Sequence, residues 1–312
     1  MASTISAMKR SAQRHGLGTT ITLTVFGEQD DRALNAAFAL IADYEDRLTV
    51  NRPVSEVMAV NDAAGKSSVV VSTSTYELIS AAVAASRGNF GYDALIGPLV
   101  KLWKIGFTGA RVPHDDEIAA RMGEISPEAV DLDAATHAVK LTKPGMELDL
   151  GGIAKGYIAD RIRDMWTAYG VAAGIVDLGG NLLFVGESPR RDDARWVIGV
   201  QDPVRSRHTD LGMAVLPSCS AVTSGIYERY LEIDGHKYHH LLDPRTGRPL
   251  DTDLAGVTVF TRDSIAGEIE AKRLFFAGGP IDGWTHAPAV FGAVFVYADG
   301  RVVSDGITLL KP

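Results

Sequence analysis

Polar and apolar positions alternate with a period of two in several short stretches, which predicts half-buried β-strands. Residues 19–27 (TTITLTVFG) show this alternation near the N-terminus. Farther along, Asp234-Gly235 separates residues 229–233 from residues 237–242, and an Asp-Gly pair between two such runs is a strong signal for a hairpin turn. Residues 298–300 (ADG) turn FGAVFVY back into RVVS in the same way, and residues 177–181 (DLGGN) join two further apolar runs. The second half of the chain is therefore expected to be rich in strands.

Other stretches carry apolar residues three and four positions apart, the spacing of an amphipathic helix. One helix is predicted to start after Asp30 or Asp31, either of which can cap it. Its apolar face comprises Leu34, Phe38, Ile41, Tyr44 and Leu48. A second helix carries Tyr76, Leu78, Ile79, Ala82 and Val83 and stops at Gly88. Three more are predicted at about residues 115–122, 153–169 and 264–276. Strands and helices mix without regular β-α-β alternation, so we predict an α+β fold. Residues 1–16 are expected to be disordered and residues 17–312 to form a single domain.

Composition narrows the class of protein. The 312 residues are 46% hydrophobic and 22% charged, as in ordinary soluble proteins, and the net charge of −8 argues against non-specific nucleic-acid binding. Cys219 is the only cysteine, which excludes an intrachain disulfide. No stretch of about 18 apolar residues occurs, so we expect no membrane insertion. The N-terminus has no apolar run of signal-peptide length. We therefore expect a cytoplasmic protein; the alternative is an exported form whose signal or lipid anchor has been removed.

The segment with the clearest chemistry is residues 147–160 (ELDLGGIAKGYIAD), in which a strand runs through a Gly-Gly turn into a helix. Glycines let backbone N–H groups approach an anion, and a helix N-terminus carries partial positive charge. Lys155 adds a full cation in the first turn, where the helix dipole favours an acid. A phosphate facing Lys155 would explain that position. Taken alone, the Gly-Gly pair favours the simpler interpretation, a tight strand-to-helix turn.

Three further stretches combine polar side chains with turn residues. Residues 89–103 contain Asp93 in an irregular loop, where it either binds a ligand or caps the next helix. Residues 223–229 and 238–247 place His239 and His240 on one strand, so the two side chains point to opposite faces and at most one can line a given site. A single strand histidine is more often structural than catalytic. Near the C-terminus, residues 266–279 place Glu268 and Lys272 four apart on one helical face, which is by default a helix-stabilising ion pair.

Together these stretches resemble the FAD:protein FMN transferases, the ApbE-type flavin transferases. The matching segments are LDLGGIAKGY (148–157), GGN (179–181), SGIYERY (224–230) and YHHLLDPRTG (238–247). The resemblance also includes residues 18–20, 96–106, Ser55-Glu56 and Asn61, and so covers nearly the whole chain. It implies an α+β fold of the T-fold kind, with mixed strands and helices around a central flavin-nucleotide cleft. The implied activity is cleavage of FAD and attachment of FMN, through a phosphoester bond, to a Ser or Thr of an acceptor flavoprotein or redox-complex subunit, with release of AMP.

The resemblance also implies a set of site residues. His240, Lys155 and Glu268 match catalytic positions. Contacts to the flavin nucleotide are implied for Leu17, Gly18, Thr19, Asn51, Gly91, Tyr92, Asp93, Asp149, Lys155, Ser224, Gly225 and His240. In the family Mg²⁺ bridges the FAD pyrophosphate, and the metal positions fall on the Ala154 carbonyl, Glu268 and Lys272. Lys155 and His240 also suit phosphoryl transfer on physical grounds, since that reaction needs charge neutralisation and a proton relay.

The sequence departs from the family pattern at the metal positions. Relatives carry Asp and Thr where this chain has Glu268 and Lys272. Glutamate can still bind Mg²⁺ through oxygen, but a protonated lysine cannot ligate and repels a cation. Either Lys272 partly replaces the metal, or the chain binds FAD with impaired catalysis. A third alternative is an FAD pyrophosphatase that uses water as the acceptor. Asn51 is a further departure, because many members carry an aromatic residue there.

Overall fold

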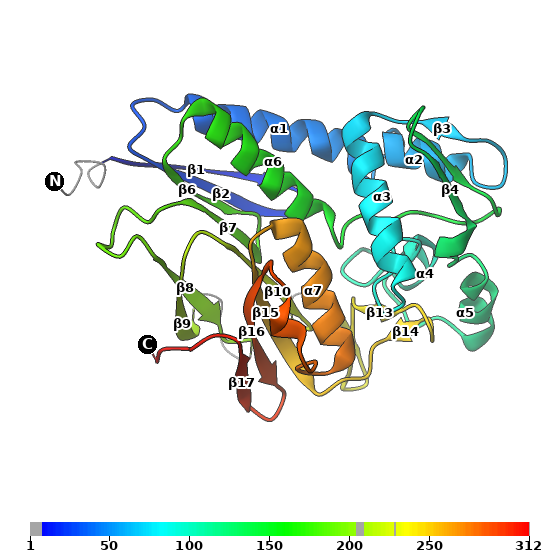
Figure 1. The fold of residues 1–312 in the computed structure, drawn as a ribbon. Helices are drawn as coiled ribbons and strands as arrows, with labels where there is room; N and C mark the ends of the chain where they lie inside the picture. The colour runs from blue at the N-terminus through cyan, green and yellow to red at the C-terminus, as the bar shows by residue number, and fades with distance from the viewer. Residues whose placement is uncertain (1–7, 204–208, 228, 312) are drawn as a thin grey trace. The chain divides into compact units, whose positions relative to one another are not determined.

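The computed structural model describes residues 8–203, 209–227 and 229–311 (Figure 1). Its contacts divide the chain into two compact units, each assembled from separate stretches of sequence. Unit 1 comprises residues 1–45, 153–225 and 253–312, and unit 2 comprises residues 46–152 and 226–252. The range expected to form a single domain thus contains two units. No linker composition marks them, because the chain passes between them in mid-motif, for example between Gly152 and Ile153.

Unit 1 is built on an eight-stranded antiparallel sheet with the order β1-β2-β6-β7-β10-β15-β16-β17. The strands are β1 (Lys9–Gly16), β2 (Thr19–Phe26), β6 (Ala173–Asp177), β7 (Asn181–Gly186), β10 (Ser220–Gly225), β15 (Leu254–Thr261), β16 (Val290–Tyr297) and β17 (Val302–Asp305). A separate hairpin consists of β8 (Trp196–Gln201) and β9 (Asp210–Leu216). The predicted strand at residues 19–27 and the predicted ADG hairpin are confirmed as β2 and β16–β17.

The first strand differs from the sequence prediction. Residues 9–16, expected to belong to a disordered segment, form β1 and pair with β2 from Lys9↔Phe26 to Gly16↔Thr19. Residues 1–7 of that segment lie outside the described part of the chain. The strand lies at the edge of the sheet and most of its side chains are exposed. It is held by backbone hydrogen bonds, so it carries no alternating apolar pattern to predict it.

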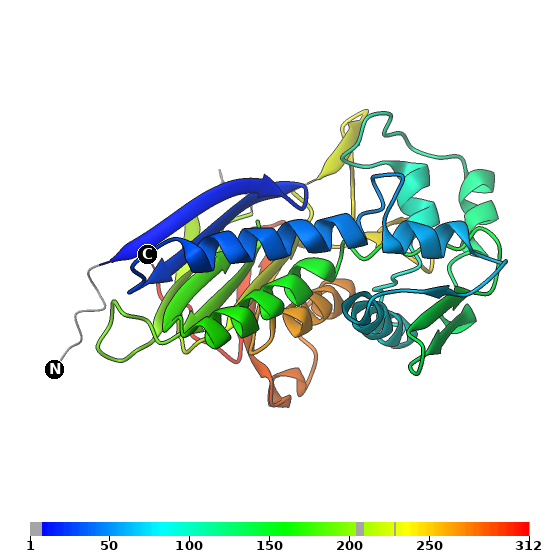
Figure 2. The ribbon, with the colours of Figure 1, turned by 90° about the horizontal axis from the view of Figure 1, so that it is seen from above.

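Three helices cover one face of the unit 1 sheet: α1 (Arg32–Leu48), α6 (Ala154–Tyr169) and α7 (Ser264–Ala277) (Figure 2). All five apolar residues predicted for the first helix are buried. Trp166 of α6 is fully buried, and its Nε1 donates a 3.0 Å hydrogen bond to the Ala33 carbonyl. On the opposite face, Phe184 and Phe260 form a core with Trp196 of the β8–β9 hairpin.

Unit 2 contains the helices α2 (Glu56–Asp62), α3 (Thr73–Arg87), α4 (Gly97–Trp103) and α5 (Asp115–Met122), which include the two predicted around Tyr76 and at 115–122. Its small sheet has the order β3-β5-β4, with β3 (Val69–Val70), β4 (Val130–Asp133) and β5 (Ala138–Leu141). Two short hairpins complete it: β11 (Tyr230–Ile233) with β12 (His236–His239), and β13 (Leu242–Asp243) with β14 (Arg248–Pro249). Single 3-10 turns lie at Pro127–Ala129 in unit 2 and at Trp284–His286 in unit 1.

The predicted Asp-Gly hairpin turn is confirmed between β11 and β12. Asp234 and Gly235 have φ values of 52° and 77°, both in the left-handed region that a tight two-residue hairpin turn requires. The mixture of helices and antiparallel sheet also confirms the predicted α+β class. Within the described ranges, no helix is long and apolar enough to span a membrane.

Candidate functional site

Lys155 lies in the first turn of α6, beside the turn between β6 and β7. Its Nζ donates a 3.2 Å hydrogen bond to the Gly179 carbonyl. Gly179 has a φ of 69°, and a side chain there would collide with the Thr19 hydroxyl. The helix start, the DLGGN turn and the β1–β2 turn therefore meet at one place in unit 1. A cation, a helix N-terminus and glycine backbone at one point form the arrangement that binds phosphate groups.

The β1–β2 turn and the first residue of β2 carry three of the predicted nucleotide contacts, Leu17, Gly18 and Thr19. Leu17 and Gly18 have positive φ values of 52° and 69°, and the Leu17 N–H donates to Glu45 Oε1 at 3.1 Å. Two more predicted contacts, Ser224 and Gly225, lie at the end of β10, where Ser224 is buried. Glu228, in the same motif, lies outside the described residues.

Helices α6 and α7 approach each other closely because residue 156 is glycine. A Cβ on Gly156 would lie 2.5 Å from the Ser264 carbonyl oxygen and 2.8 Å from Glu268 Cγ. Asp160, one turn farther along α6, accepts hydrogen bonds of 2.9 Å from the backbone N–H groups of both Ser264 and Ile265. These are the first residues of α7, whose N–H groups have no partner inside the helix. Burial raises the pKa of Asp160, although these N–H groups and Arg163 stabilise its charge.

Glu268 and Lys272, the positions that match the family metal site, form a buried ion pair. Lys272 Nζ lies 2.8 Å from Glu268 Oε2, and the two side chains are only 11% and 5% exposed. The other carboxylate oxygen, Oε1, accepts a 2.9 Å hydrogen bond from Asn181 Nδ2. Asn181 Oδ1 in turn accepts from the Ser264 hydroxyl at 2.9 Å.

The electrostatics of Glu268 are decided by its neighbours. Burial alone raises the pKa of this carboxyl, but the charges of Lys272 and Lys155, with the hydrogen bonds from Lys272 and Asn181, outweigh burial and hold the pKa below its ordinary value. Glu268 is thus an ionised carboxylate on which two lysine charges act. Ala154, the third predicted metal position, is the first residue of α6, one residue before Lys155.

In unit 2, Asp149 ties two predicted segments together. Its backbone N–H donates a 2.7 Å hydrogen bond to the Ala94 carbonyl, which joins the LDLGG segment to the loop of residues 91–95. Its carboxylate accepts a 2.8 Å hydrogen bond from the Gly151 N–H. Burial raises the pKa of Asp149, and neither that N–H nor the positive charge of Arg229 offsets the effect. A carboxylate perturbed in this way is typical of functional sites.

The loop of residues 91–95 holds Tyr92 and Asp93 buried. Burial raises the pKa of Asp93 to about 6, even though its Oδ1 accepts a 2.8 Å hydrogen bond from the Leu95 N–H. The Ser86 hydroxyl, at the end of α3, accepts a 2.8 Å hydrogen bond from the Ala94 N–H and fixes the loop from the other side. Gly91 enters the loop with a φ of 109°. The predicted contacts Gly91, Tyr92, Asp93 and Asp149 are thereby held together in unit 2.

His239 and His240 lie in different surroundings. His239 is 6% exposed, its Nε2 lies 2.8 Å from the Leu250 carbonyl, and burial lowers its pKa. The less buried His240 has its Nδ1 3.2 Å from the Arg229 carbonyl. A carbonyl oxygen only accepts hydrogen bonds, so Nδ1 carries the proton in this contact and Nε2 is the basic nitrogen of the neutral ring. His240 thus has the better geometry for proton transfer, and its catalytic role stays a prediction.

Two motif segments are explained by structure. In DPRTG, the Asp243 carboxylate accepts bonds of 2.8 and 2.7 Å from the Arg245 guanidinium, and the turn presents the Gly247 carbonyl to Trp103 Nε1 at 2.8 Å. Asn61 bonds the backbone of Leu148 in both directions. The predicted contact Asn51 is exposed, and its N–H donates to the Thr49 hydroxyl at 3.1 Å.

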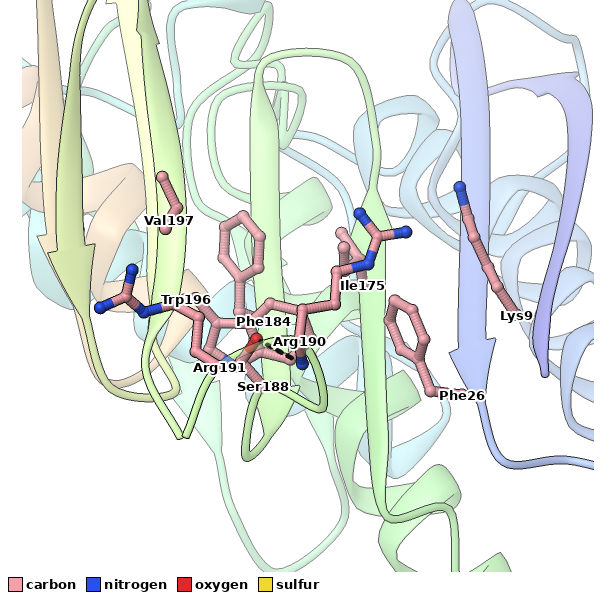
Figure 3. Close-up of a pocket in the computed structure, with 9 residues that line it drawn as sticks. All are labelled: Lys9, Phe26, Ile175, Phe184, Ser188, Arg190, Arg191, Trp196 and Val197. Carbon is pink, nitrogen blue, oxygen red and sulfur yellow. Dashed lines mark hydrogen bonds between the residues drawn. The ribbon is translucent and has the colours of Figure 1, made fainter. Parts of the chain in front are cut away.

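A pocket in unit 1 is lined by a different set of residues. Figure 3 shows aromatic side chains from β2, β7 and β8 facing basic side chains from β1 and the loop before β8. The side chains are those of Phe26, Phe184, Trp196, Lys9, Arg190 and Arg191. The Arg190 guanidinium lies 5.6 Å from the Phe26 ring. None of the predicted site residues lines this pocket.

The sequence analysis did not single out the residues that organise the α6–α7 contact: Asp160, Asn181 and Ser264. In the sequence, Asn181 appears only as part of the GGN motif. Its position directly after two glycines was the available signal, while Asp160 and Ser264 meet across 104 residues of sequence. A polar chain of this kind connects residues that no local spacing relates.

The lysine, the helix N-terminus and the glycine turn, held on an antiparallel sheet, define an α+β protein with a candidate anion site. The ApbE family matches residues 17–287. An FAD:protein FMN transferase of Klebsiella pneumoniae (strain 342) is 45% identical over 263 residues, which cover 84% of this chain and 80% of that protein. One from Treponema pallidum (strain Nichols) is 35% identical over 278 residues, covering 84% and 77%. The crystal structure of the ApbE protein of Thermotoga maritima superimposes with a TM-score of 0.85 at 29% identity, over 96% of this chain and 97% of that one. The chain belongs to the ApbE family.

Proposed function

We propose that this chain is an FAD:protein FMN transferase, which cleaves FAD and attaches FMN to a Ser or Thr hydroxyl of an acceptor flavoprotein. The observation that carries the proposal is the Lys155–Gly179 contact at the start of α6, in a chain that is 45% identical to a protein of that name. FAD is the donor substrate. The binding-only and pyrophosphatase alternatives are not favoured, since the relatives with the highest identities above are all named as transferases.

In the proposed reaction the acceptor hydroxyl oxygen attacks the phosphorus of the FMN half. A new P–O ester bond forms, the pyrophosphate P–O bond to AMP breaks, and the hydroxyl proton passes to a base. Phosphoryl transfer asks a protein mainly for position and charge neutralisation. Lys155 and the N–H groups at the start of α6 supply positive charge, and His240 is the candidate base through Nε2.

The residues present do not fit a Mg²⁺ site at the family position. Both oxygens of Glu268 already accept hydrogen bonds, from Asn181 and from Lys272. Mg²⁺ needs near-octahedral oxygen ligands, and an ammonium group repels it. Among the residues that the structure describes, no three His, Cys, Asp or Glu side chains are grouped so that they could hold a metal ion. Charge neutralisation in the proposed reaction is therefore assigned to Lys155 and the N–H groups at the start of α6.

The test is to incubate the protein with FAD and a candidate acceptor, then measure acceptor mass and free AMP. A transferase produces an acceptor heavier by one FMN group and an equal amount of AMP. AMP and FMN released without a change in acceptor mass would indicate a pyrophosphatase instead. FAD binding with neither product, across several acceptors from redox complexes, would contradict the proposal.

A further inference from the structure

Helix α7 buries a pair of opposite charges that would ordinarily lie in solvent. Glu268 and Lys272 are 3% and 9% exposed, and Lys272 Nζ contacts both the Glu268 carboxylate at 2.8 Å and the Glu268 carbonyl at 3.2 Å. An i,i+4 pair stabilises a helix only weakly, whereas removing two charges from water costs more than the pair usually returns. Helix stability therefore does not account for the burial of this pair.

The pair is held in place by neighbouring elements of unit 1. Asn181, at the start of β7, donates to Glu268, and the Ser264 hydroxyl donates to Asn181. The Ser220 hydroxyl of β10 donates to Ser264 at 3.0 Å. Gly156 brings α6 within van der Waals distance of Glu268. A buried polar network with its members satisfied fixes one arrangement of charges.

Two positive charges act on the single carboxylate of Glu268. Glu268 contributes one negative charge, while Lys272 contributes one positive charge at 2.8 Å and Lys155 a second that also acts on Glu268. Lys155 stands at the N-terminus of α6, where the helix dipole adds further positive potential. The protein's own ammonium group thus stands at a position where the family resemblance places a metal ligand.

We propose that the buried Lys272 ammonium takes the place of a divalent cation in this chain, so that FAD is bound without Mg²⁺. The inference rests on the proposed function only for the identity of the ligand, FAD. A divalent ion at this point would lie beside an ammonium group and against a carboxylate already engaged by two donors. The Lys272 ammonium is attached to α7 and held by Glu268, so it is in position before the nucleotide binds and requires no free metal ion.

Calorimetric titration of FAD into the wild-type protein tests this directly, once in EDTA and once with saturating Mg²⁺. We expect the two dissociation constants to agree within about threefold, and we expect electron paramagnetic resonance to detect no Mn²⁺ bound to the protein with FAD present. A gain in FAD affinity of about tenfold or more with Mg²⁺, or a stoichiometric Mn²⁺ site, would overturn the inference.

Variants at Lys272 sharpen the test. Lys272→Thr removes the ammonium and offers an oxygen ligand, so FAD binding should weaken in EDTA and recover by about tenfold or more with Mg²⁺. Lys272→Met removes the charge without offering an oxygen and should recover less. Lys66→Thr, the same change at an exposed lysine in the turn after α2, should behave like the wild type. If Lys272→Thr binds FAD as the wild type does in EDTA, the ammonium has no role and the inference is wrong.

Circular dichroism shows whether each variant folds. If a variant does not fold, the titration of the wild-type protein still decides whether FAD binding depends on Mg²⁺. Neither titration requires catalysis, so the inference and the proposed function fail separately. A wild type that binds FAD equally in EDTA and Mg²⁺ but transfers no FMN supports the metal-free site and contradicts the transferase. A wild type that transfers FMN but binds FAD only with Mg²⁺ supports the transferase and contradicts the metal-free site.

Discussion

The side-chain amide of Asn61 pairs with the backbone of Leu148 in both directions. Its Nδ2 donates to the Leu148 carbonyl at 3.0 Å, and its Oδ1 accepts from the Leu148 N–H at 2.8 Å. The next residue, Asp149, is fixed by Ala94 from another side. The strand predicted before the Gly-Gly turn is wrong, because residues 146–150 belong to no strand of the structure. The LDLGG segment is positioned by these side-chain and loop contacts instead.

Replacement of Asn61 by alanine should therefore destabilise the protein. Both polar groups of Leu148 would lose their buried partner, so we expect the free energy of unfolding to fall by about 2–4 kcal/mol. Urea denaturation followed by circular dichroism measures the change. Asn35→Ala, at an exposed position of α1, is the matched control and should shift stability by less than about 0.5 kcal/mol. Equal effects of the two changes would contradict this account of Asn61.

The contribution of Asp93 to the free energy of unfolding should fall as the pH rises. Its pKa of about 6 in the folded protein lies above the ordinary 3.8, so the folded state holds its proton more tightly than the unfolded state does. The stabilising contribution is fully present below about pH 4 and is lost as pH rises through about 6. Asp93→Asn should therefore stabilise the protein by about 1–3 kcal/mol at pH 8, and the gain should shrink towards pH 4.

The measurement for Asp93 is denaturant unfolding at several pH values from 4 to 8, without FAD. Asp131→Asn, at an exposed position of β4, provides the control and should give a pH-independent difference near zero. A stabilisation by Asp93→Asn that is constant across this range would mean that the carboxyl does not titrate there.

Lys155→Ala should weaken FAD binding by about 1–3 kcal/mol, the usual loss for a charge-assisted hydrogen bond. Riboflavin, which has no phosphate, should bind both proteins equally, and FAD should bind the wild type more tightly than FMN or riboflavin. Calorimetry gives all of these affinities. Lys143→Ala, at an exposed lysine, should leave them unchanged. A loss of riboflavin affinity as large as that of FAD would show that Lys155 acts on the fold and not on phosphate.

The two adjacent histidines should separate catalysis from stability. His240→Ala should lower the FMN transfer rate by about 10²–10⁴ while FAD affinity is kept, if His240 is the base. His239→Ala should leave both nearly unchanged in folded protein but lower the free energy of unfolding by about 1–3 kcal/mol, because its buried ring bonds Leu250. Rate measurements paired with thermal unfolding distinguish them. A larger rate loss for His239→Ala would mean that the catalytic ring lies on the other face of the strand.

The periodicity of apolar residues predicted the helices well, because each helix buries one face and that face requires apolar side chains at helical spacing. The face from Leu34 to Leu48 is buried along its length. Gly170 ends α6 with a φ of 81°, which glycine adopts readily, and Gly88 follows the last residue of α3. Strand β1 escaped prediction because edge pairing uses backbone groups, so Lys9–Gly16 has no apolar face to detect.

The candidate site was predicted in its parts but not in its connections. The spacing of Glu268 and Lys272 indicated a contact, yet a charged pair four residues apart is normally exposed, and only the fold shows that this one is buried. Asp160 and Asn181 acquire their roles through partners 104 and 87 residues away. Such contacts depend on tertiary packing, which local propensity does not encode.

The interleaving of the two units has a consequence for how the chain acquires its structure. Thr22 of β2 pairs with Asp177 of β6. In the sequence, these two paired residues are separated by a segment that contains most of unit 2. Pairings between residues so distant in sequence close slowly, since the entropy of the intervening loop is lost before the contacts form. During synthesis, the β1–β2 hairpin cannot pair with β6 until the ribosome has passed residue 177. Strands β15 and β16 can join the sheet only after nearly the whole chain has been synthesised. Neither unit can therefore be produced as a continuous fragment, and a polypeptide halted midway would leave both unfinished.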